Sequence, residues 1–164
     1  MAVSLASTIL KATLLSCGNL PQMAPPNAPS IREVLMQYLF LAGRVLYGGF
    51  FLLAGIDHFR HVGMMTPYAA AKGIPAPRLS VLGSGSLIVL GGLSVLLGVR
   101  PTWGVLALTL FLVPTSFRMH NYWAATDPTV RQLDATNFKK NIALLGAAWM
   151  LLFIPQPWPF SLLR

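Results

Sequence analysis

The chain has 164 residues, of which 55% are hydrophobic and only 10% charged, and its mean hydropathy is +0.64. A soluble domain carries about 25% charged residues, so the composition excludes a water-soluble monomer, and the same hydrophobicity excludes a disordered chain. The charge is uneven, with 12 lysines and arginines against 4 acids and a formal net charge of +8. Because the basic residues lie between apolar blocks, they are typical of loops at a membrane surface, and we expect no nucleic-acid partner.

The first 30 residues differ from the rest of the chain. The stretch 1–15 is moderately apolar, and 21–29 is rich in proline. The single cysteine, Cys17, excludes an internal disulfide, a cysteine-ligated iron–sulfur cluster and a CxxC zinc site. Because no basic residue precedes the apolar stretch and Lys11 interrupts it, a signal peptide is disfavoured. We expect an interfacial or flexible extension at 1–30, followed by the main domain.

Four apolar runs make up the domain at 31–164. Each run is close to the roughly 20 residues that cross about 30 Å of hydrocarbon. The predicted spans are about 34–57, 79–98, 101–123 and 140–160. The alternating segments of about 10 residues that build a membrane barrel do not occur. The sequence therefore predicts an all-α integral membrane protein, a four-transmembrane-helix bundle with short loops.

Small residues indicate how these helices pack. The second span carries them at intervals of seven residues and the first offers a further set: Ser84, Gly85, Gly91, Gly92 and Gly98 in the second, and Gly43, Gly48, Gly49 and Gly55 in the first. Such positions let a neighbouring backbone approach closely, which is how helices associate in lipid.

One membrane face collects most of the charge. With four spans, the end of the first, the end of the third and the start of the fourth lie on the same face. That face holds Asp57, His58, Arg60, His61, Lys72, Arg78, Arg118, His120, Asp127, Arg131, Lys139 and Lys140. By the positive-inside rule this is the cytoplasmic face, but some of these charges could instead serve a site, which leaves the orientation open.

Arg44 lies inside the first predicted span. It is about ten residues into that span, which at roughly 1.5 Å per residue places it near mid-bilayer. A lone charge there costs about 2.5–3.5 kcal/mol, and none of the other three spans contains an acid. Its expected partners are backbone carbonyls (Pro114 would free that of Leu110), water, or an anionic or carbonyl-bearing ligand. Alternatively, Arg44 snorkels to the nearer face because the span is tilted or begins late.

Two motifs end apolar spans on the basic face, GIDHF at 55–59 and RMHNYW at 118–123. Histidines such as His58 and His120 change charge near neutral pH. Two interpretations are open: an interfacial belt of aromatic and basic residues, or a pocket in which histidines exchange protons and arginines hold an oxygen-bearing head group. Haem ligated by both histidines is disfavoured because they lie at helix ends. Zinc needs three or four close ligands, so we expect no metal.

The start of the fourth predicted span is basic. Lys139 and Lys140 are typical of anchors to lipid phosphate. Asn141 could cap the helix or hydrogen-bond to another helix. The loop before it supplies two acids for local pairing with basic neighbours, Asp127 and Asp134 with Arg131 and Lys139.

Five segments in fixed order resemble the DoxX family over about residues 32–153. They are RVLYGGFFLLAGIDHF (44–59), GIPAP (73–77), LGGLSVLLG (90–98), FLVPTSFRMHNYW (111–123) and NFKKNIALLGAA (137–148). The resemblance implies a small four-helix, multi-pass protein of the bacterial cytoplasmic (inner) membrane. Some proteins of the family are subunits of a thiosulfate:quinone oxidoreductase or terminal quinol oxidase, and others are membrane partners of soluble redox or detoxifying enzymes. The family's recurrent polar positions match Arg44, His58, His120, Lys140 and Asn141.

These observations lead to a first hypothesis, an integral membrane subunit of a redox assembly that handles quinone or quinol. The candidate catalytic residues are His58 and His120, and the candidate binding residues are Arg44, Arg118, Trp123, Lys140 and Asn141. The sequence carries no flavin, nicotinamide or iron–sulfur motif, so electrons would come from a partner subunit or a bound cofactor. The chain is then at most a quinone-interacting subunit, and enzymatic activity of its own stays open.

The alternative hypothesis is a non-catalytic structural or anchoring subunit of a larger membrane complex. Its lipid-facing helices would hold it in the bilayer, and its basic face could bind an acidic protein partner. A small transporter is disfavoured because the spans contain few polar residues to line an aqueous path and lack an inverted repeat.

Overall fold

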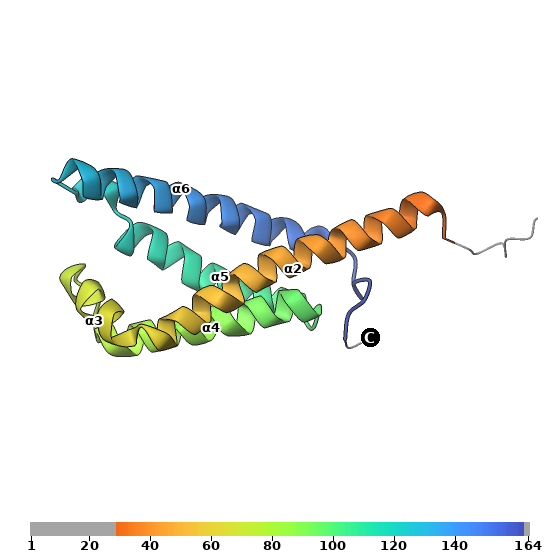
Figure 1. The fold of residues 1–164 in the computed structure, drawn as a ribbon, viewed down its shortest axis with the longest axis horizontal. Coiled ribbons are helices and arrows are strands. Elements are labelled where there is room, and N and C mark those ends of the chain that lie inside the picture. The colour runs from red at the N-terminus through yellow and green to blue at the C-terminus, as the bar shows by residue number, and fades with distance from the viewer. Residues whose placement is uncertain (1–28, 163–164) are drawn as a thin grey trace, which may run out of the picture. The chain divides into compact units, whose positions relative to one another are not determined.

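The computed structural model describes residues 29–162, so the predicted extension at 1–30 lies almost entirely outside the described residues. The described residues form helices and no strand (Figure 1). The helices are α2 (Ile31–Arg60), α3 (Val62–Ala71), α4 (Pro77–Leu97), α5 (Pro101–Pro114) and α6 (Pro128–Met150), with a π-helical turn η1 (Thr115–Met119) and 3-10 turns η2 (Tyr122–Ala124) and η3 (Leu151–Phe153).

The chain divides into two compact units, Met1–Met36 and Gln37–Arg164. The described part of the first unit is the beginning of α2. There the Ser30 N–H donates to Glu33 Oε2 at 2.7 Å, and the Glu33 N–H donates to Ser30 Oγ at 3.2 Å. This reciprocal pair is a capping box, which satisfies two of the free donors at a helix N-terminus. The remaining helices, and α2 from Gln37 onward, belong to the second unit.

Prolines and one aspartate set the starts of the later helices. Pro77, Pro101 and Pro128 occupy the first turn of α4, α5 and α6, where a fixed φ and a missing N–H carry no penalty. Asp127 caps α6, its Oδ1 accepting from the N–H groups of residues 129 and 130 at 2.8 and 3.0 Å. The expectation that Asn141 caps this helix is therefore wrong, because local capping starts α6 well before the apolar run begins.

Helix α6 also ends before the predicted fourth span does. It stops at Met150, and after η3 the chain is non-helical, in part because Pro155 disfavours helix at the residue before it. The following tail packs back on the helices: Trp158 is only 2% exposed, and the Leu162 N–H donates to the Leu97 carbonyl at 3.1 Å.

Three helical segments among the described residues are long and apolar enough to cross a membrane: Ile31–Arg60, Pro77–Leu97 and Pro101–Ala124. Large apolar side chains point outward from them; Leu46 is 76% exposed and Leu90 is 64% exposed. Lipid is the solvent that such surfaces require. The structure thus supports an all-helical protein in contact with lipid and three of the four predicted spans. Helix α6 is not among these three segments, because its first half is polar.

Glycines allow the first two long helices to touch. A Cβ at Gly48 would lie 2.8 Å from the carbonyl oxygen of Gly92, and a Cβ at Gly55 would lie 3.1 Å from that of Gly85. Real Cβ atoms essentially never come within 3.0 Å of another heavy atom, so only glycine fits at Gly48, and the contact at Gly55 is tight. The predicted close approach through small residues is confirmed for these positions.

Three predicted glycines do not share this role. Nothing lies within 4 Å of a Cβ built on Gly43 or Gly49. Gly98 ends α4 with φ of +69°, a left-handed conformation that glycine adopts at little cost. Its part is to terminate a helix.

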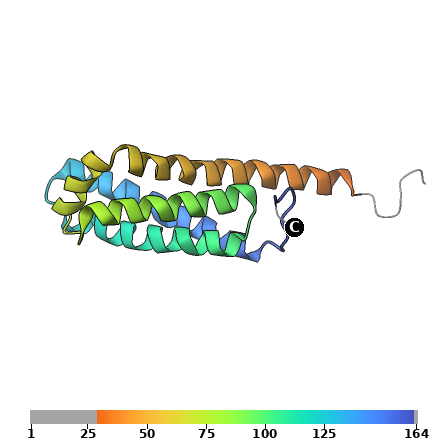
Figure 2. The ribbon, with the colours of Figure 1, turned by 90° about the horizontal axis from the view of Figure 1, so that it is seen from below.

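Helices α4 and α5 lie side by side, with α6 along α5 and α3 against α4 (Figure 2). Their core consists of Phe51, Ile88, Val95, Leu108, Leu112, Leu145 and Trp158. Helix α2 contributes Phe51 and α6 contributes Leu145, so four helices share one core. The end of this core that faces α3 opens into a cavity.

Candidate functional site

A cavity of about 810 Å³ lies where the end of α2, α3, the first half of α4, the end of α5 and the middle of α6 come together. Its volume is within the range of about 300–1,000 Å³ that holds small-molecule ligands. Most of its wall is apolar, from residues such as Phe50, Leu87 and Phe111. The polar wall residues are His58, Tyr68, Ser80, Ser84, Thr115, Arg118, His120, Lys140 and Asn141. Such a lining suits a ligand with an apolar body and a polar head.

Five of the seven predicted site residues line this cavity: His58, Arg118, His120, Lys140 and Asn141. They come from α2, η1, the residue after η1, and α6. The predicted binding residues Arg44 and Trp123 are not in its wall. The structure therefore brings the two histidine motifs and the start of the fourth apolar run together, and separates two residues from them.

His58 is held by its own helix. Its Nδ1 lies 2.8 Å from the carbonyl oxygen of Ala54, and because a carbonyl only accepts, the proton is on Nδ1. The ring also packs edge-on against Phe111, with 5.9 Å between ring centroids. When the ring is neutral, the lone pair is then on Nε2.

His120 is positioned by an irregular turn. After Pro114 the chain forms the π-helical turn η1, and the His120 N–H donates to the Thr115 carbonyl at 3.3 Å. Such π turns are frequent at functional sites. The ring's Nδ1 lies 3.2 Å from Oδ1 of Asp134. An ionised carboxylate only accepts, so Nδ1 carries a proton, and in the neutral ring the lone pair is then on Nε2.

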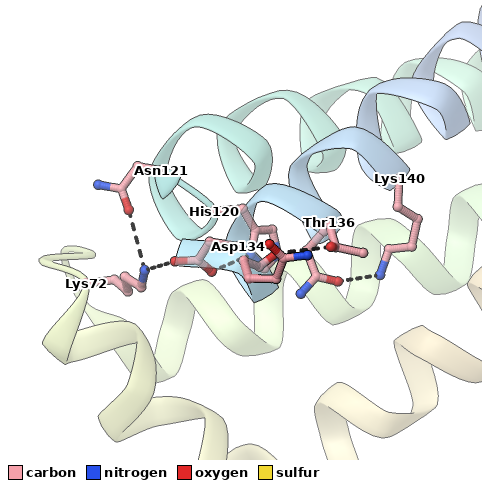
Figure 3. A network of polar contacts seen from close by, with 8 residues as sticks. Lys72, His120, Asn121, Asp134, Thr136 and Lys140 are labelled. Carbon is pink, nitrogen blue, oxygen red and sulfur yellow. Dashed lines mark hydrogen bonds and ion pairs between the residues drawn. The ribbon is translucent and has the colours of Figure 1, made fainter. Parts of the chain in front are cut away.

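Asp134 is the centre of a polar network (Figure 3). Its side chain is 2% exposed, and its second oxygen, Oδ2, accepts from Lys72 Nζ at 2.7 Å. Lys72 also donates to Asn121 Oδ1 at 3.4 Å. Burial alone would raise the pKa of Asp134, but the hydrogen bonds and charges of Lys72 and His120 outweigh it, so the pKa lies below its ordinary value. The buried acid is thus ionised and paired on both oxygens.

The local pairing predicted for Asp134 does not occur. The predicted partners were Arg131 and Lys139, whereas the observed partners are Lys72, 62 residues away, and His120. The local expectation is wrong because Asp134 is inside α6, on the face that packs inward. A signal was present: Asp134, Asn141, Leu145 and Ala148, the buried residues of α6, recur at helical spacing. Placing the helix start at Asp127 would have revealed it.

Arg44 is almost fully buried, at 2% exposure, and is held by backbone carbonyls. Its Nε, Nη1 and Nη2 donate to the carbonyls of Val95, Pro159 and Leu96 at 3.1, 2.6 and 3.0 Å. Because α4 ends at Leu97, Arg44 is level with a helix end rather than with the middle of α4. Backbone carbonyls were among the predicted partners of Arg44, and the structure confirms this, but the Leu110 carbonyl is not one of them.

Trp123 lies in η2 and belongs to an aromatic cluster formed by η1, η2 and α6. Its ring lies 5.8 Å from that of Phe138 and 5.2 Å from that of Tyr122, centroid to centroid, and it is 53% exposed. A half-exposed cluster of this kind is typical of the membrane interface. Within residues 29–162 no three His, Cys, Asp or Glu side chains are grouped as a metal site requires.

The fold and the cavity define a class, a multi-pass helical membrane protein with a ligand-sized cavity at the end of its core. The DoxX family model matches residues 39–121, about half of the chain. The protein belongs to the DoxX family. No curated protein and no solved structure matches the chain.

Proposed function

We propose that the protein is a membrane subunit of a redox assembly and that it binds a quinone or quinol head group in the cavity between α2, α3, α4, α5 and α6. One observation supports this above the others: an apolar cavity of about 810 Å³ whose polar wall contains two histidines from different elements. A quinone is an apolar ring and tail with two oxygens, so the cavity and the ligand have the same distribution of polarity.

The polar wall can serve both redox forms of such a ligand. Quinone oxygens only accept hydrogen bonds, and Arg118, Lys140 and Asn141 carry donors. Quinol hydroxyls donate, and Nε2 of His58 and of His120 can accept. A subunit that binds the head group in both forms suits a step in which quinol is oxidised or quinone reduced.

The electrons must come from outside the chain's own side chains. The sequence has no flavin, nicotinamide or iron–sulfur motif, so a partner subunit or a bound cofactor supplies or removes them. We place the assembly in the bacterial cytoplasmic membrane, since quinones dissolve in the bilayer and the family resemblance implies this membrane.

We also propose a fourth span, formed by α6 after Lys140 and continued by η3. Two features support it. Leu145 and Ala148 on this part of α6 are buried in the shared core, and its outer side chains are apolar, with Met150 71% exposed. Asp134 precedes this part, at the basic end of the bundle.

Quinone binding by the purified protein tests the proposal. The full chain in nanodiscs of phosphatidylcholine and phosphatidylglycerol is titrated with decylubiquinone and decylubiquinol. We expect binding, and about a fivefold weaker binding of decylubiquinol by His120→Gln, because one hydrogen bond of about 1 kcal/mol is lost. His61→Gln is the matched control: His61 is half-exposed and outside the cavity wall, so its affinity should equal that of the wild type.

Two results would contradict the proposal. Absence of binding of either form would remove the quinone role, and equal effects of His120→Gln and His61→Gln would place the ligand elsewhere. A complex that keeps its activity when this subunit is deleted would favour the anchoring role.

A further inference from the structure

The two histidines of the cavity differ in what holds Nδ1. For His58 the acceptor is the neutral carbonyl of Ala54, and for His120 it is the buried carboxylate of Asp134. A neutral carbonyl fixes the ring but contributes little when the ring becomes charged. A carboxylate fixes the ring in the same way and also stabilises an imidazolium. Both rings are therefore held in a fixed orientation. Only the ring of His120 has an acceptor that also stabilises it when it carries a second proton.

Both rings keep Nε2 available. In the part of the chain that the structure describes, neither Nε2 has a hydrogen-bond partner. In the non-exposed residues of that part, every side-chain nitrogen or oxygen that is fully buried has a hydrogen-bond partner. Because the two Nε2 atoms have no partner, they are not fully buried. Since both residues line the cavity, Nε2 is the atom through which each can meet a ligand.

The two oxygens of Asp134 have different partners. Oδ2 accepts from Lys72 Nζ, and Oδ1 accepts from Nδ1 of His120. Lys72 keeps the carboxylate ionised, as a direct ion pair does, and leaves one oxygen for the ring. Burial of the ring, Lys140 in the cavity wall and Lys72 itself oppose an extra positive charge on His120, whereas Asp134 favours it.

We propose that His120, and not His58, is the proton acceptor for a bound quinol, and that Asp134 is its positioning residue. This inference rests on the proposed function. In the step, the O–H bond of one quinol hydroxyl breaks and an Nε2–H bond forms, giving a quinolate anion and an imidazolium. No electron moves in this step. The imidazolium is then paired with Asp134, and the quinolate lies near Arg118 and Lys140.

The test follows the three histidines of the chain, His58, His61 and His120, by nitrogen NMR of the full chain in nanodiscs, each assigned by its His→Gln variant. In Asp134→Asn, the pH at which His120 takes a second proton should fall by about 1–3 pH units, the shift expected when an adjacent opposite charge is lost. The titration of His58 should not move. Addition of decylubiquinol should shift the Nε2 signal of His120 more than that of His58.

A double variant keeps the inference testable if the single variant Asp134→Asn does not fold. Asp134→Asn leaves the Lys72 ammonium without its carboxylate, so Asp134→Asn/Lys72→Gln removes both charges and keeps groups that can hydrogen-bond. A shift at His120 in the same direction is expected in this variant, and it should be smaller because the loss of Lys72 removes a charge that opposes protonation of the ring. A purely structural role of Asp134 would leave the His120 titration unchanged in a folded double variant, which would overturn the inference.

The remaining outcomes separate the two proposals. If decylubiquinol binds but shifts His58 as much as His120, the assignment of the acceptor is wrong and the quinone role stands. If the Asp134 variants move both rings equally, the carboxylate is not specific to His120 and the inference fails. If neither quinol nor quinone binds, the proposed function fails, and the proton step fails with it.

Discussion

The sharpest prediction for the fold concerns Arg44→Met. Arg44 joins three parts of the chain, since α2 carries it and its acceptors are the end of α4 and the C-terminal tail at Pro159. Methionine keeps most of the apolar stem and removes all the donors. The variant thus isolates the polar part of the contact.

The expected loss of unfolding free energy follows from the carbonyls that lose their hydrogen-bond donor in Arg44→Met. The Val95 carbonyl still accepts from the Gly98 N–H at 3.3 Å, but those of Leu96 and Pro159 lose the donor that Arg44 provides. A buried acceptor without a partner costs about 1–3 kcal/mol, so the two cost about 2–6 kcal/mol. Removal of a buried cation returns part of this, because its desolvation no longer opposes folding. We expect the free energy of unfolding to fall by about 3 kcal/mol.

Two measurements in mixed micelles check the result. Unfolding by sodium dodecyl sulfate, followed by circular dichroism, gives the free energy. Acrylamide quenching of Trp158 fluorescence reports on the tail, in a background where Trp103, Trp123 and Trp149 are replaced by phenylalanine, because Trp158 is 2% exposed and its ring centroid lies 5.4 Å from the Arg44 guanidinium carbon. We expect strong quenching of Trp158 in Arg44→Met and weak quenching in the wild type. Arg60→Met, at an exposed position of the same helix, is the matched control and should behave as the wild type.

The reasoning would be refuted by an Arg44→Met protein as stable as Arg60→Met with Trp158 still protected. That result would mean that the tail is held by packing alone and that the three hydrogen bonds contribute nothing net. Arg44→Lys separates charge from geometry: a single ammonium cannot reach three carbonyls as a guanidinium does, so an intermediate loss is expected.

Three further predictions concern stability. Because folding lowers the pKa of Asp134 from its ordinary 3.8, its ionised form stabilises the fold above that value. This stabilisation should fade as the pH drops below about 5 and through the lowered pKa; unfolding midpoints measured across this range should show the loss in the wild type and not in Asp134→Asn. Gly92→Leu should lower the unfolding free energy by at least about 1–3 kcal/mol, since a Cβ there would lie 2.8 Å from a backbone nitrogen of α2, whereas Gly49→Leu, which has open space around it, should be neutral in the same assay. Asp127→Ala should cost about 1 kcal/mol through loss of the α6 cap, and Asp127→Ser should restore most of it; equal stability of the two variants would argue against capping.

Much of the fold could be predicted because its signals are local. The predicted spans 79–98 and 101–123 correspond closely to Pro77–Leu97 and Pro101–Ala124, since apolar runs bounded by proline and glycine mark where helices in lipid begin and end. The fourth run was harder, because α6 begins in polar sequence at an aspartate cap and its apolar half is short. Hydropathy alone assigned that polar half to a loop, and with it Asp134.

Part of the candidate site could be predicted for the same reason. Histidine, arginine and asparagine beside apolar runs indicated a polar end of the bundle, and five of those residues do share a cavity. The sequence could not show that Arg44 belongs to a different contact, because its acceptors are backbone carbonyls 51 to 115 residues away and any residue can supply a carbonyl.

The sequence by itself determined the membrane class, the family, and most helix limits, because composition, hydropathy and short motifs act over one or two turns of chain. Only the tertiary structure decided which charged side chains form pairs. Lys72 and His120 reach Asp134 across 62 and 14 residues, and a pairing at such separations depends on how α3, η1 and α6 pack. The physical reason is that a buried acid in a protein with few charges must find its partners wherever the packed helices bring them, and no local pattern records that meeting.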